Sequence, residues 1–139
     1  IGSLVLGGFD MSANLRVEPH WDTLLYARQK LVHAAANAGV DLLDMPYFEL
    51  DNFKGLRRES EECSKLGFTG KCAIHPKQIE AINNTFTPTI EEIEHAKTLI
   101  DKYQSQDAAF VEIDGVLMEK PIVDRLYRTL AIADRIKSQ

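Results

Sequence analysis

The fold is decided by residues 66–79, which read LGFTGKCAIHPKQI. Gly67 is typical of the residue that ends a helix, because glycine adopts the left-handed backbone conformation required there without strain. The stretch from Lys71 to Ile74 predicts a short strand. Pro76 predicts the start of the next helix, where a missing N–H group has no partner to lose. This run therefore predicts helix, strand and helix in direct succession, an order typical of parallel α/β proteins.

The same alternation extends toward the N-terminus. Residues 1–9, IGSLVLGGF, are apolar and end in glycines, which predicts a strand buried on both faces. A polar loop is expected from there to His20. The apolar spacing of residues 22–38 predicts a helix that Gly39 ends, and residues 40–43 predict a second strand. The order fits parallel strands joined by right-handed helical crossovers.

A further helix is expected between the loop at 44–52 and the run quoted above. Asp51 is predicted to cap its start, since a side-chain oxygen there accepts hydrogen bonds from the first free backbone N–H groups. Glu59, Glu61 and Glu62 are interpreted as solvated residues on the surface of this helix, and they are assigned no role in chemistry.

The pattern changes near the C-terminus. Residues 109–118 predict a small strand pair around Asp114-Gly115, which is a typical turn dipeptide. Pro121 predicts the start of a terminal helix. The inward face of that helix is expected to carry apolar residues: Ile122, Leu126, Leu130, Ala133 and Ile136. We therefore divide the chain into residues 1–105 and residues 106–139.

Composition narrows the class of protein. The 139 residues are 45% hydrophobic and 27% charged, with a net charge of −5, which is typical of a globular domain and unlike a nucleic-acid binder. The apolar runs are too short to span a bilayer, and no basic segment precedes the first of them as in a signal peptide. Cys63 and Cys72 do not make a disulfide framework. We expect a cytoplasmic protein with no nucleic-acid or membrane partner.

The predicted strands are too few to close a barrel, because a complete (β/α)₈ barrel needs about 250 residues. Two interpretations remain: a flavodoxin-like miniature, or part of a larger enzyme. Four stretches decide between them: 6–15 (LGGFDMSANL), 26–28 (YAR), 44–47 (DMPY) and the run at 66–79. In this order they resemble the C-terminal half of the citrate lyase β-subunit, malyl-CoA lyase and citramalyl-CoA lyase group, within the HpcH/HpaI aldolase family.

The resemblance implies a fold. Residues 1–105 are expected to form part of a (β/α)₈ TIM barrel, with the strands corresponding to the sixth, seventh and eighth of the barrel. Residues 106–139 are expected to be a C-terminal extension with a terminal helix, folded over an active site that is often that of a neighbouring subunit. The relatives also imply a homo-oligomer, either a trimer or a multiple of one.

The resemblance implies an activity as well: Mg²⁺-dependent carbon–carbon cleavage of aldol type, or the reverse condensation, on a citryl-, malyl- or citramalyl-thioester. CoA is then part of the substrate, although an acyl-carrier protein remains open as the carrier. Acyl-CoA thioester hydrolysis and a non-catalytic subunit or fragment are the alternatives. A second metal carboxylate and an arginine for the substrate are expected outside these residues, so the chain alone is expected to be inactive.

Asp10 is the candidate metal ligand. It follows the first predicted strand, and the C-terminal ends of the strands form the catalytic face of a barrel. Mg²⁺ prefers oxygen ligands, and the family pattern places a metal-binding carboxylate at this position. On position alone, Asp10 is equally a loop aspartate that accepts hydrogen bonds from nearby backbone N–H groups.

Further residues on this face are candidates for substrate binding: Gly7, Gly8, Phe9, Pro46 and His75. Glycines let backbone N–H groups approach a ligand closely and stabilise a developing oxyanion, or they only permit a tight exit from the strand. An exposed histidine is a candidate acid–base group. The alternative is a histidine whose hydrogen bond anchors the turn between strand and helix.

Glu119 is the candidate catalytic residue. It lies in residues 114–121, DGVLMEKP, where related lyases carry Gly-x-Met-[IV]-Asp-x-Pro with an aspartate that acts as acid or base across a subunit boundary. Here glutamate takes that position, and leucine replaces the methionine. A displacement of about 1 Å costs about 100-fold in rate, so the change predicts an altered substrate or activity. The alternative is a solvated glutamate at a helix start, favoured by the helix dipole.

Overall fold

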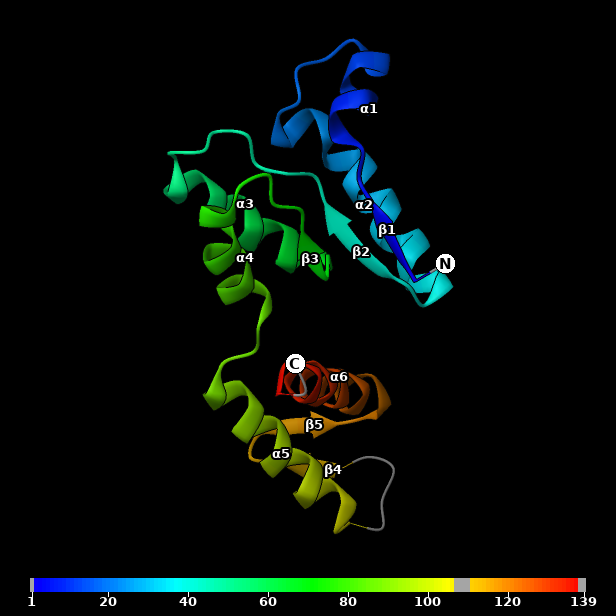
Figure 1. The fold of residues 1–139 in the computed structure, drawn as a ribbon. Helices are drawn as coiled ribbons and strands as arrows, with labels where there is room; N and C mark the ends of the chain where they lie inside the picture. Colours follow the sequence, from blue (N-terminus) through cyan, green and yellow to red (C-terminus); the bar gives the residue numbers. More distant parts are fainter. Residues whose placement is uncertain (1, 107–110, 138–139) are drawn as a thin grey trace. The chain divides into compact units, whose positions relative to one another are not determined.

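A parallel sheet with helices packed against it forms the first of two compact units, Ile1–Phe86 (Figure 1). The computed structural model describes residues 2–106 and 111–137 of the chain. The elements of this unit are, in chain order, β1 (Ser3–Val5), α1 (Gly8–Leu15), α2 (Trp21–Ala38), β2 (Asp41–Asp44), α3 (Phe53–Leu66), β3 (Gly70–Lys71), the 3-10 helix η1 (Pro76–Gln78) and α4 (Ile79–Phe86). β2 lies between β1 and β3, and both strand pairs are parallel. The predicted α/β class is confirmed.

The core of this unit lies between the sheet and the helices α2 and α3. Leu42 of β2 is 1% exposed and belongs to a cluster with Ala35, Cys63 and Phe68. Side chains alternate between the two faces of a strand. Leu4 of β1 packs on this cluster, whereas its neighbour Val5 is 55% exposed. The prediction of a first strand buried on both faces is therefore wrong for the described residues, because the helices pack on the face that carries Leu42.

Helix α1 occupies residues that were predicted to form a polar loop. The N–H of Met11 donates to the carbonyl of Gly7 at 3.0 Å, which closes the first turn. Ser12 is 3% exposed, and its hydroxyl donates to an earlier carbonyl of the same helix at 2.9 Å. Arg16 ends the helix in the left-handed conformation with φ of 60°. Asp10 consequently lies in the first turn of a helix.

Two predicted helix ends are confirmed, and one predicted helix cap is wrong. Gly39 and Gly67 end α2 and α3 in the left-handed conformation, with φ of 64° and 108°. The cap of α3 is Asn52, whose Oδ1 accepts from a backbone N–H of the first turn at 2.8 Å. The predicted cap, Asp51, is wrong by one residue, and its carboxylate instead pairs with the ammonium of Lys77 at 2.6 Å.

Strand β3 begins earlier and ends earlier than predicted. The expected strand at 71–74 is reduced to Gly70–Lys71. The N–H of Cys72 donates to the carbonyl of Asp44 at 3.0 Å, just beyond the paired residues. The chain then turns toward Pro76, which starts η1 as predicted.

The second unit, Thr87–Gln139, is built from a helix, a hairpin and a helix. Its elements are α5 (Ile90–Gln104), β4 (Val111–Ile113), β5 (Val116–Met118) and α6 (Lys120–Lys137). Asp114 and Gly115 join the antiparallel strands with positive φ values of 52° and 79°, as a tight hairpin turn requires. The predicted strand pair is confirmed in its described part, while Ala109 and Phe110 lie outside the described residues.

The apolar faces of α5 and α6 close over this hairpin. Their shared core consists of Ala96, Leu99, Ile100, Ile113, Met118, Val123 and Leu126. Val123 is buried, whereas Ile136, which was predicted to face inward, is 45% exposed. Helix α5 thus packs with the second unit, and the compact units divide after Phe86. The assignment of residues 1–105 to a barrel and 106–139 to an extension stays a prediction.

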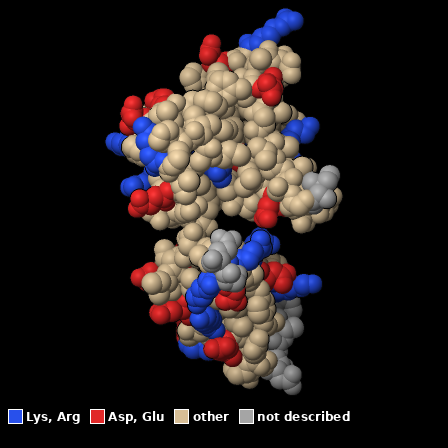
Figure 2. Space-filling model, in the orientation of Figure 1, with Lys and Arg blue, Asp and Glu red and all other residues tan. Residues whose placement is uncertain are grey.

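Charges of both signs surround the visible face of the first unit. Figure 2 shows this face as largely uncharged, with Lys, Arg, Asp and Glu side chains scattered along its edges. Within the described residues, no helix combines the length and the hydrophobicity that crossing a bilayer requires.

Candidate active site

The predicted site residues of the first unit gather at one edge of the sheet. Parallel strands place their C-terminal ends together, and open α/β sheets bind ligands at this edge. The residues concerned follow β1 (Gly7, Gly8, Phe9, Asp10), β2 (Pro46) and β3 (His75). The expectation that they share one edge agrees with the observed strand order.

Gly8 is required by packing. A Cβ atom placed on it would lie 2.1 Å from the Sδ of Met45 and 3.3 Å from the Cδ1 of Leu24. Met45 is 4% exposed, so a larger residue at position 8 displaces a buried side chain. A Cβ atom on Gly7, by contrast, would meet only the Oδ2 of Asp10 at 3.7 Å, which is an ordinary contact. Gly8 therefore fits closely onto Met45, while the backbone at Gly7 stays open.

Phe9 and Pro46, both predicted to bind substrate, line one cavity of about 220 Å³. The ring of Phe9 packs edge-on against Phe48 with 4.2 Å between the ring centroids. Trp21 and Tyr47 contribute further aromatic surface to the lining. Glu49 and Glu59 line the same cavity, so it offers a ligand both aromatic surface and carboxylate oxygens.

Asp10 is exposed, and its carboxylate is accessible at the start of α1. Across residues 2–106 and 111–137, however, no group of three or more His, Cys, Asp and Glu side chains is placed to hold a metal ion. Mg²⁺ takes six ligands in near-octahedral geometry, of which proteins often supply one or two carboxylates. The described residues thus fit one ligand of a magnesium site and not a complete site.

His75 caps η1. Its Nδ1 accepts a hydrogen bond from the N–H of Lys77 at 3.1 Å, and the ring is exposed. This agrees with the alternative in which the histidine anchors the turn between strand and helix. It does not line the cavity that holds Phe9 and Pro46.

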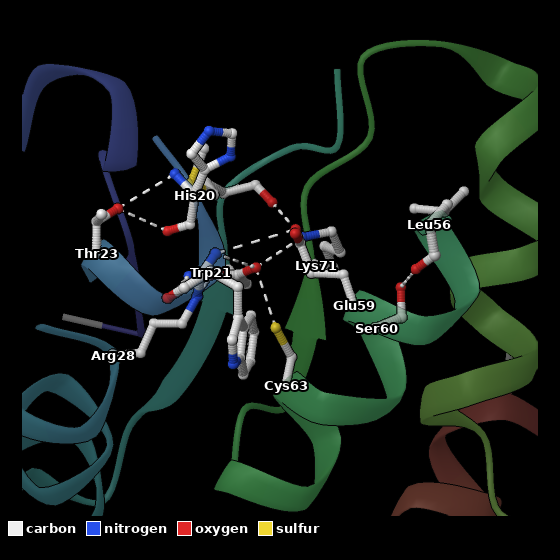
Figure 3. Close-up of polar contacts among 11 residues, drawn as sticks. His20, Trp21, Thr23, Arg28, Leu56, Glu59, Ser60, Cys63 and Lys71 are labelled. Carbon is white, nitrogen blue, oxygen red and sulfur yellow. Dashed lines mark hydrogen bonds and ion pairs between the residues drawn. The ribbon is translucent and has the colours of Figure 1, made fainter. Parts of the chain in front are cut away.

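A buried network of charged side chains lies beside the same edge, and sequence reasoning missed it. Figure 3 shows Arg28, Cys63 and Lys71 converging on one carboxylate, which belongs to Asp44 at the end of β2. Its Oδ1 accepts from the Nε of Arg28 at 2.9 Å, and its Oδ2 accepts from the Nζ of Lys71 at 2.6 Å and from the Sγ of Cys63 at 3.0 Å. The guanidinium of Arg28 also stacks on the ring of Trp21, 4.4 Å from its centroid.

Lys71 donates to two further acceptors. Its Nζ lies 2.7 Å from the Oε1 of Glu59 and 2.8 Å from the carbonyl oxygen of Met45. The side chains of Lys71 and Asp44 are both fully buried, and that of Glu59 is 21% exposed. The interpretation of Glu59 as a solvated surface residue is therefore wrong, because it pairs with a cation that no solvent reaches.

The charges of this network stabilise one another. Burial by itself raises the pKa of the Asp44 carboxyl group, but Lys71 and Arg28 outweigh burial and hold the pKa below its usual range. Burial likewise disfavours the charged form of Lys71, yet Asp44 and Glu59 outweigh it and raise the pKa of the ammonium group. Asp44 and Lys71 are therefore both ionised at neutral pH.

Cys63 is a donor in this network and not a nucleophile. Burial, followed by the negative charge of Asp44 and the hydrogen bond to it, raises the pKa of its thiol. A thiol must lose its proton to react, so Cys63 is held in its inert form. Both Cys63 and Cys72 are free thiols, in agreement with their interpretation as small packing residues.

Glu119 belongs to the second unit and stands at the start of α6. Its carbonyl oxygen accepts from the N–H groups of Ile122 and Val123, both at 3.0 Å, so its backbone closes the first turn of that helix. Its side chain is partly buried. The backbone arrangement agrees with the prediction of a helix-start glutamate, and the catalytic role stays a prediction.

The sequence of this chain matches a known family. A family profile described as HpcH/HpaI aldolase/citrate lyase matches residues 1–76. Citrate lyase subunit beta of Haemophilus influenzae is 36% identical over 127 residues, which cover 88% of this chain and 44% of that protein. Mitochondrial citramalyl-CoA lyase of Rattus norvegicus is 33% identical and covers 100% of this chain and 43% of its own length. The (3S)-malyl-CoA thioesterase of Cereibacter sphaeroides is 31% identical over 98% of this chain and 50% of its own. The chain thus spans half the length of these relatives or less.

Solved structures share the fold. RipC from Yersinia pestis is 41% identical with a TM-score of 0.65, over 67% of this chain and 43% of that one. CitE from Mycobacterium tuberculosis, solved with magnesium, acetoacetate and coenzyme A, has a TM-score of 0.78 over 94% of this chain and 51% of its own. At 21% identity, the second likeness shows the fold alone.

The buried network yields a prediction for stability. Replacing Asp44 by Asn leaves Glu59 as the only carboxylate paired with the two buried cations, Arg28 and Lys71, so one buried positive charge is uncompensated and the free energy of unfolding should fall by about 3–5 kcal/mol. The lowered pKa means that Asp44 stabilises the protein fully above the unfolded value of about 3.9 and loses this effect as the pH falls through its folded value. Urea unfolding of the complete protein, followed from neutral pH downward, measures both effects.

The wild-type protein should lose stability below about pH 4 more steeply than Asp44→Asn. Glu62→Gln, at an exposed position on α3, is the matched control and should follow the wild type. Equal acid slopes in the wild type and in Asp44→Asn would show that Asp44 is not a stabilising buried charge.

Proposed function

The chain belongs to the HpcH/HpaI aldolase/citrate lyase family, and we propose that the complete protein is a magnesium-dependent carbon–carbon lyase acting on a 3-hydroxyacyl-CoA. The observation that carries this proposal is the placement of Asp10 in the first turn of α1, at the C-terminal edge of the parallel sheet and beside the open backbone of Gly7. Two matching relatives are named as lyases, of citrate and of citramalyl-CoA.

We assign β1, β2 and β3 to the sixth, seventh and eighth strands of a (β/α)₈ barrel. The uncovered sheet face at Val5 supports this assignment, because that face would line a barrel interior filled by side chains of the other strands. The match to about half of each relative's length also supports it. Residues 106–139 would then be the extension that covers an active site, in a homo-oligomer that is a trimer or a multiple of one.

In this proposal Asp10 is one magnesium ligand, and a second carboxylate comes from outside the chain. Magnesium, when bound, would act as a Lewis acid on the hydroxyl oxygen of the carbon whose bond is cleaved. The first N–H groups of α1, at Gly8 and Phe9, have no partner within their own helix and point at its N-terminal end, where they suit a substrate carboxylate. Phe9 and Pro46 would contact the acyl part of the substrate, and His75 the rim of the site.

The proposed cleavage breaks the bond between the hydroxyl-bearing carbon and the carbon next to the thioester carbonyl. The hydroxyl proton passes to a water molecule, the electrons of the breaking bond pass to the thioester as an enolate, and an α-keto acid leaves. Glu119 is assigned to proton transfer at that enolate, as an acid in cleavage and as a base in condensation. Thioester hydrolysis is the second candidate, supported by the relative named as a malyl-CoA thioesterase.

The assignment of Asp10 predicts that Asp10→Ala abolishes Mg²⁺-dependent turnover in the complete protein and leaves the unfolding midpoint almost unchanged, because the side chain is exposed. Mg²⁺ affinity by titration calorimetry and turnover of a 3-hydroxyacyl-CoA measure these effects. Asp22→Ala is the control, since Asp22 is likewise an exposed acid in the first turn of a helix. Wild-type Mg²⁺ affinity and rate in Asp10→Ala would remove Asp10 from the metal site.

The assignment of Glu119 predicts a different pattern. Glu119→Gln should lower kcat strongly and leave KM nearly unchanged, because a proton-transfer interaction is made mainly in the transition state. Glu119→Asp should keep part of the activity, since aspartate retains a carboxyl group that can transfer a proton. Steady-state kinetics of both variants decide the matter, and an unchanged kcat in Glu119→Gln would leave the residue with its helix-start role alone.

A further inference from the structure

The motif at 66–79 contains two buried side chains that the proposed mechanism leaves unused, Lys71 and Gln78. The side chain of Lys71 is fully buried, and Gln78 is 1% exposed. Each donates to a backbone carbonyl of the segment that follows β2. The Nζ of Lys71 lies 2.8 Å from the oxygen of Met45, and the Nε2 of Gln78 lies 2.7 Å from the oxygen of Tyr47.

The segment that these residues hold supports the start of α1. The side chain of Met45 fills the space next to Gly8, where no Cβ atom would fit. The residue that follows Tyr47 is Phe48, whose ring packs edge-on against Phe9 with 4.2 Å between the ring centroids. The carbonyls of residues 45 and 47 are thus fixed from β3 and η1, while the side chains of residues 45 and 48 contact α1.

From these contacts we propose that Lys71 and Gln78 are positioning residues that hold residues 45–48 against the Gly7–Asp10 turn and thereby set the geometry of the candidate active site. The inference rests on the proposed function for its activity measurement. Among the described residues, no hydrogen bond or ion pair joins Lys71 or Gln78 to this turn, so each acts through Met45 or Phe48.

The choice of lysine at position 71 fits this role better than a role in charge balance. Arg28 alone would neutralise Asp44, so Lys71 and Glu59 form an additional pair of opposite charges. Asp44 and Glu59 accept two of the three N–H groups of the ammonium and fix its orientation. The third N–H is left for the carbonyl of Met45. An apolar residue at this position would leave that buried carbonyl without its donor.

The Lys71→Met/Glu59→Gln double variant separates the two roles, because it removes one charge of each sign and keeps the pair of Arg28 with Asp44. In the complete protein we expect an unfolding midpoint closer to the wild type than that of Lys71→Met alone. We also expect kcat to fall on the order of 100-fold with KM nearly unchanged, as a misplaced active-site turn predicts. Hydrogen–deuterium exchange should be faster at residues 7–11 and 45–48.

The matched control is Lys65→Met/Glu62→Gln, which removes an exposed lysine–glutamate pair from α3, the helix that carries Glu59. It should leave kcat and exchange unchanged. A double variant at 71 and 59 whose kcat recovers together with its stability would overturn the proposal and leave Lys71 as a charge partner only. If the wild type cleaves no thioester substrate, the proposed function fails, but the positioning role can still be tested by hydrogen–deuterium exchange. Unchanged exchange at residues 7–11 and 45–48 in the Lys71→Met/Glu59→Gln variant would refute the positioning role.

Discussion

The carboxylate of Asp44 is the charge around which the first unit is arranged. It lies at the end of the middle strand, fully buried, and it binds side chains from α2, α3 and β3 at once: Arg28, Cys63 and Lys71. An ionised carboxylate without partners would cost several kcal/mol in such a place. The position of Asp44 therefore constrains both neighbouring helices and the third strand. The same constraint reaches the candidate active site, because Lys71 also binds the segment that supports α1.

Sequence reasoning succeeded where the decision is local. Gly39 and Gly67 end helices because few residues tolerate positive φ, and Asp114-Gly115 makes a hairpin turn for the same reason. It failed at the cap of α3, where Asp51 and Asn52 are both good caps and only the phase of the helix selects Asn52.

The buried network was missed for a different reason. Asp44 is 16 residues from Arg28 and 27 residues from Lys71, so no short-range pattern joins them. One available signal was Lys71 itself, a lysine at the first residue of a predicted strand, because a cation buried in a sheet requires an anion nearby. The edge of the sheet that carries Gly7, Asp10, Pro46 and His75 was predictable, because parallel strands bring their C-terminal ends together. The cavity shared by Phe9 and Pro46 could not be predicted, because it depends on the tertiary packing of Phe48.

The central claim is carbon–carbon cleavage, and product analysis tests it most directly. The complete protein is incubated with Mg²⁺ and citryl-, malyl- and citramalyl-CoA in turn, and the α-keto acid, the shortened acyl-CoA and free CoA thiol are quantified separately. We expect equal amounts of α-keto acid and shortened acyl-CoA from at least one substrate, no release of free thiol, and loss of both products when EDTA removes the metal. Free CoA without α-keto acid would identify a thioesterase and contradict the account, and the absence of every product from all three substrates would contradict it as well.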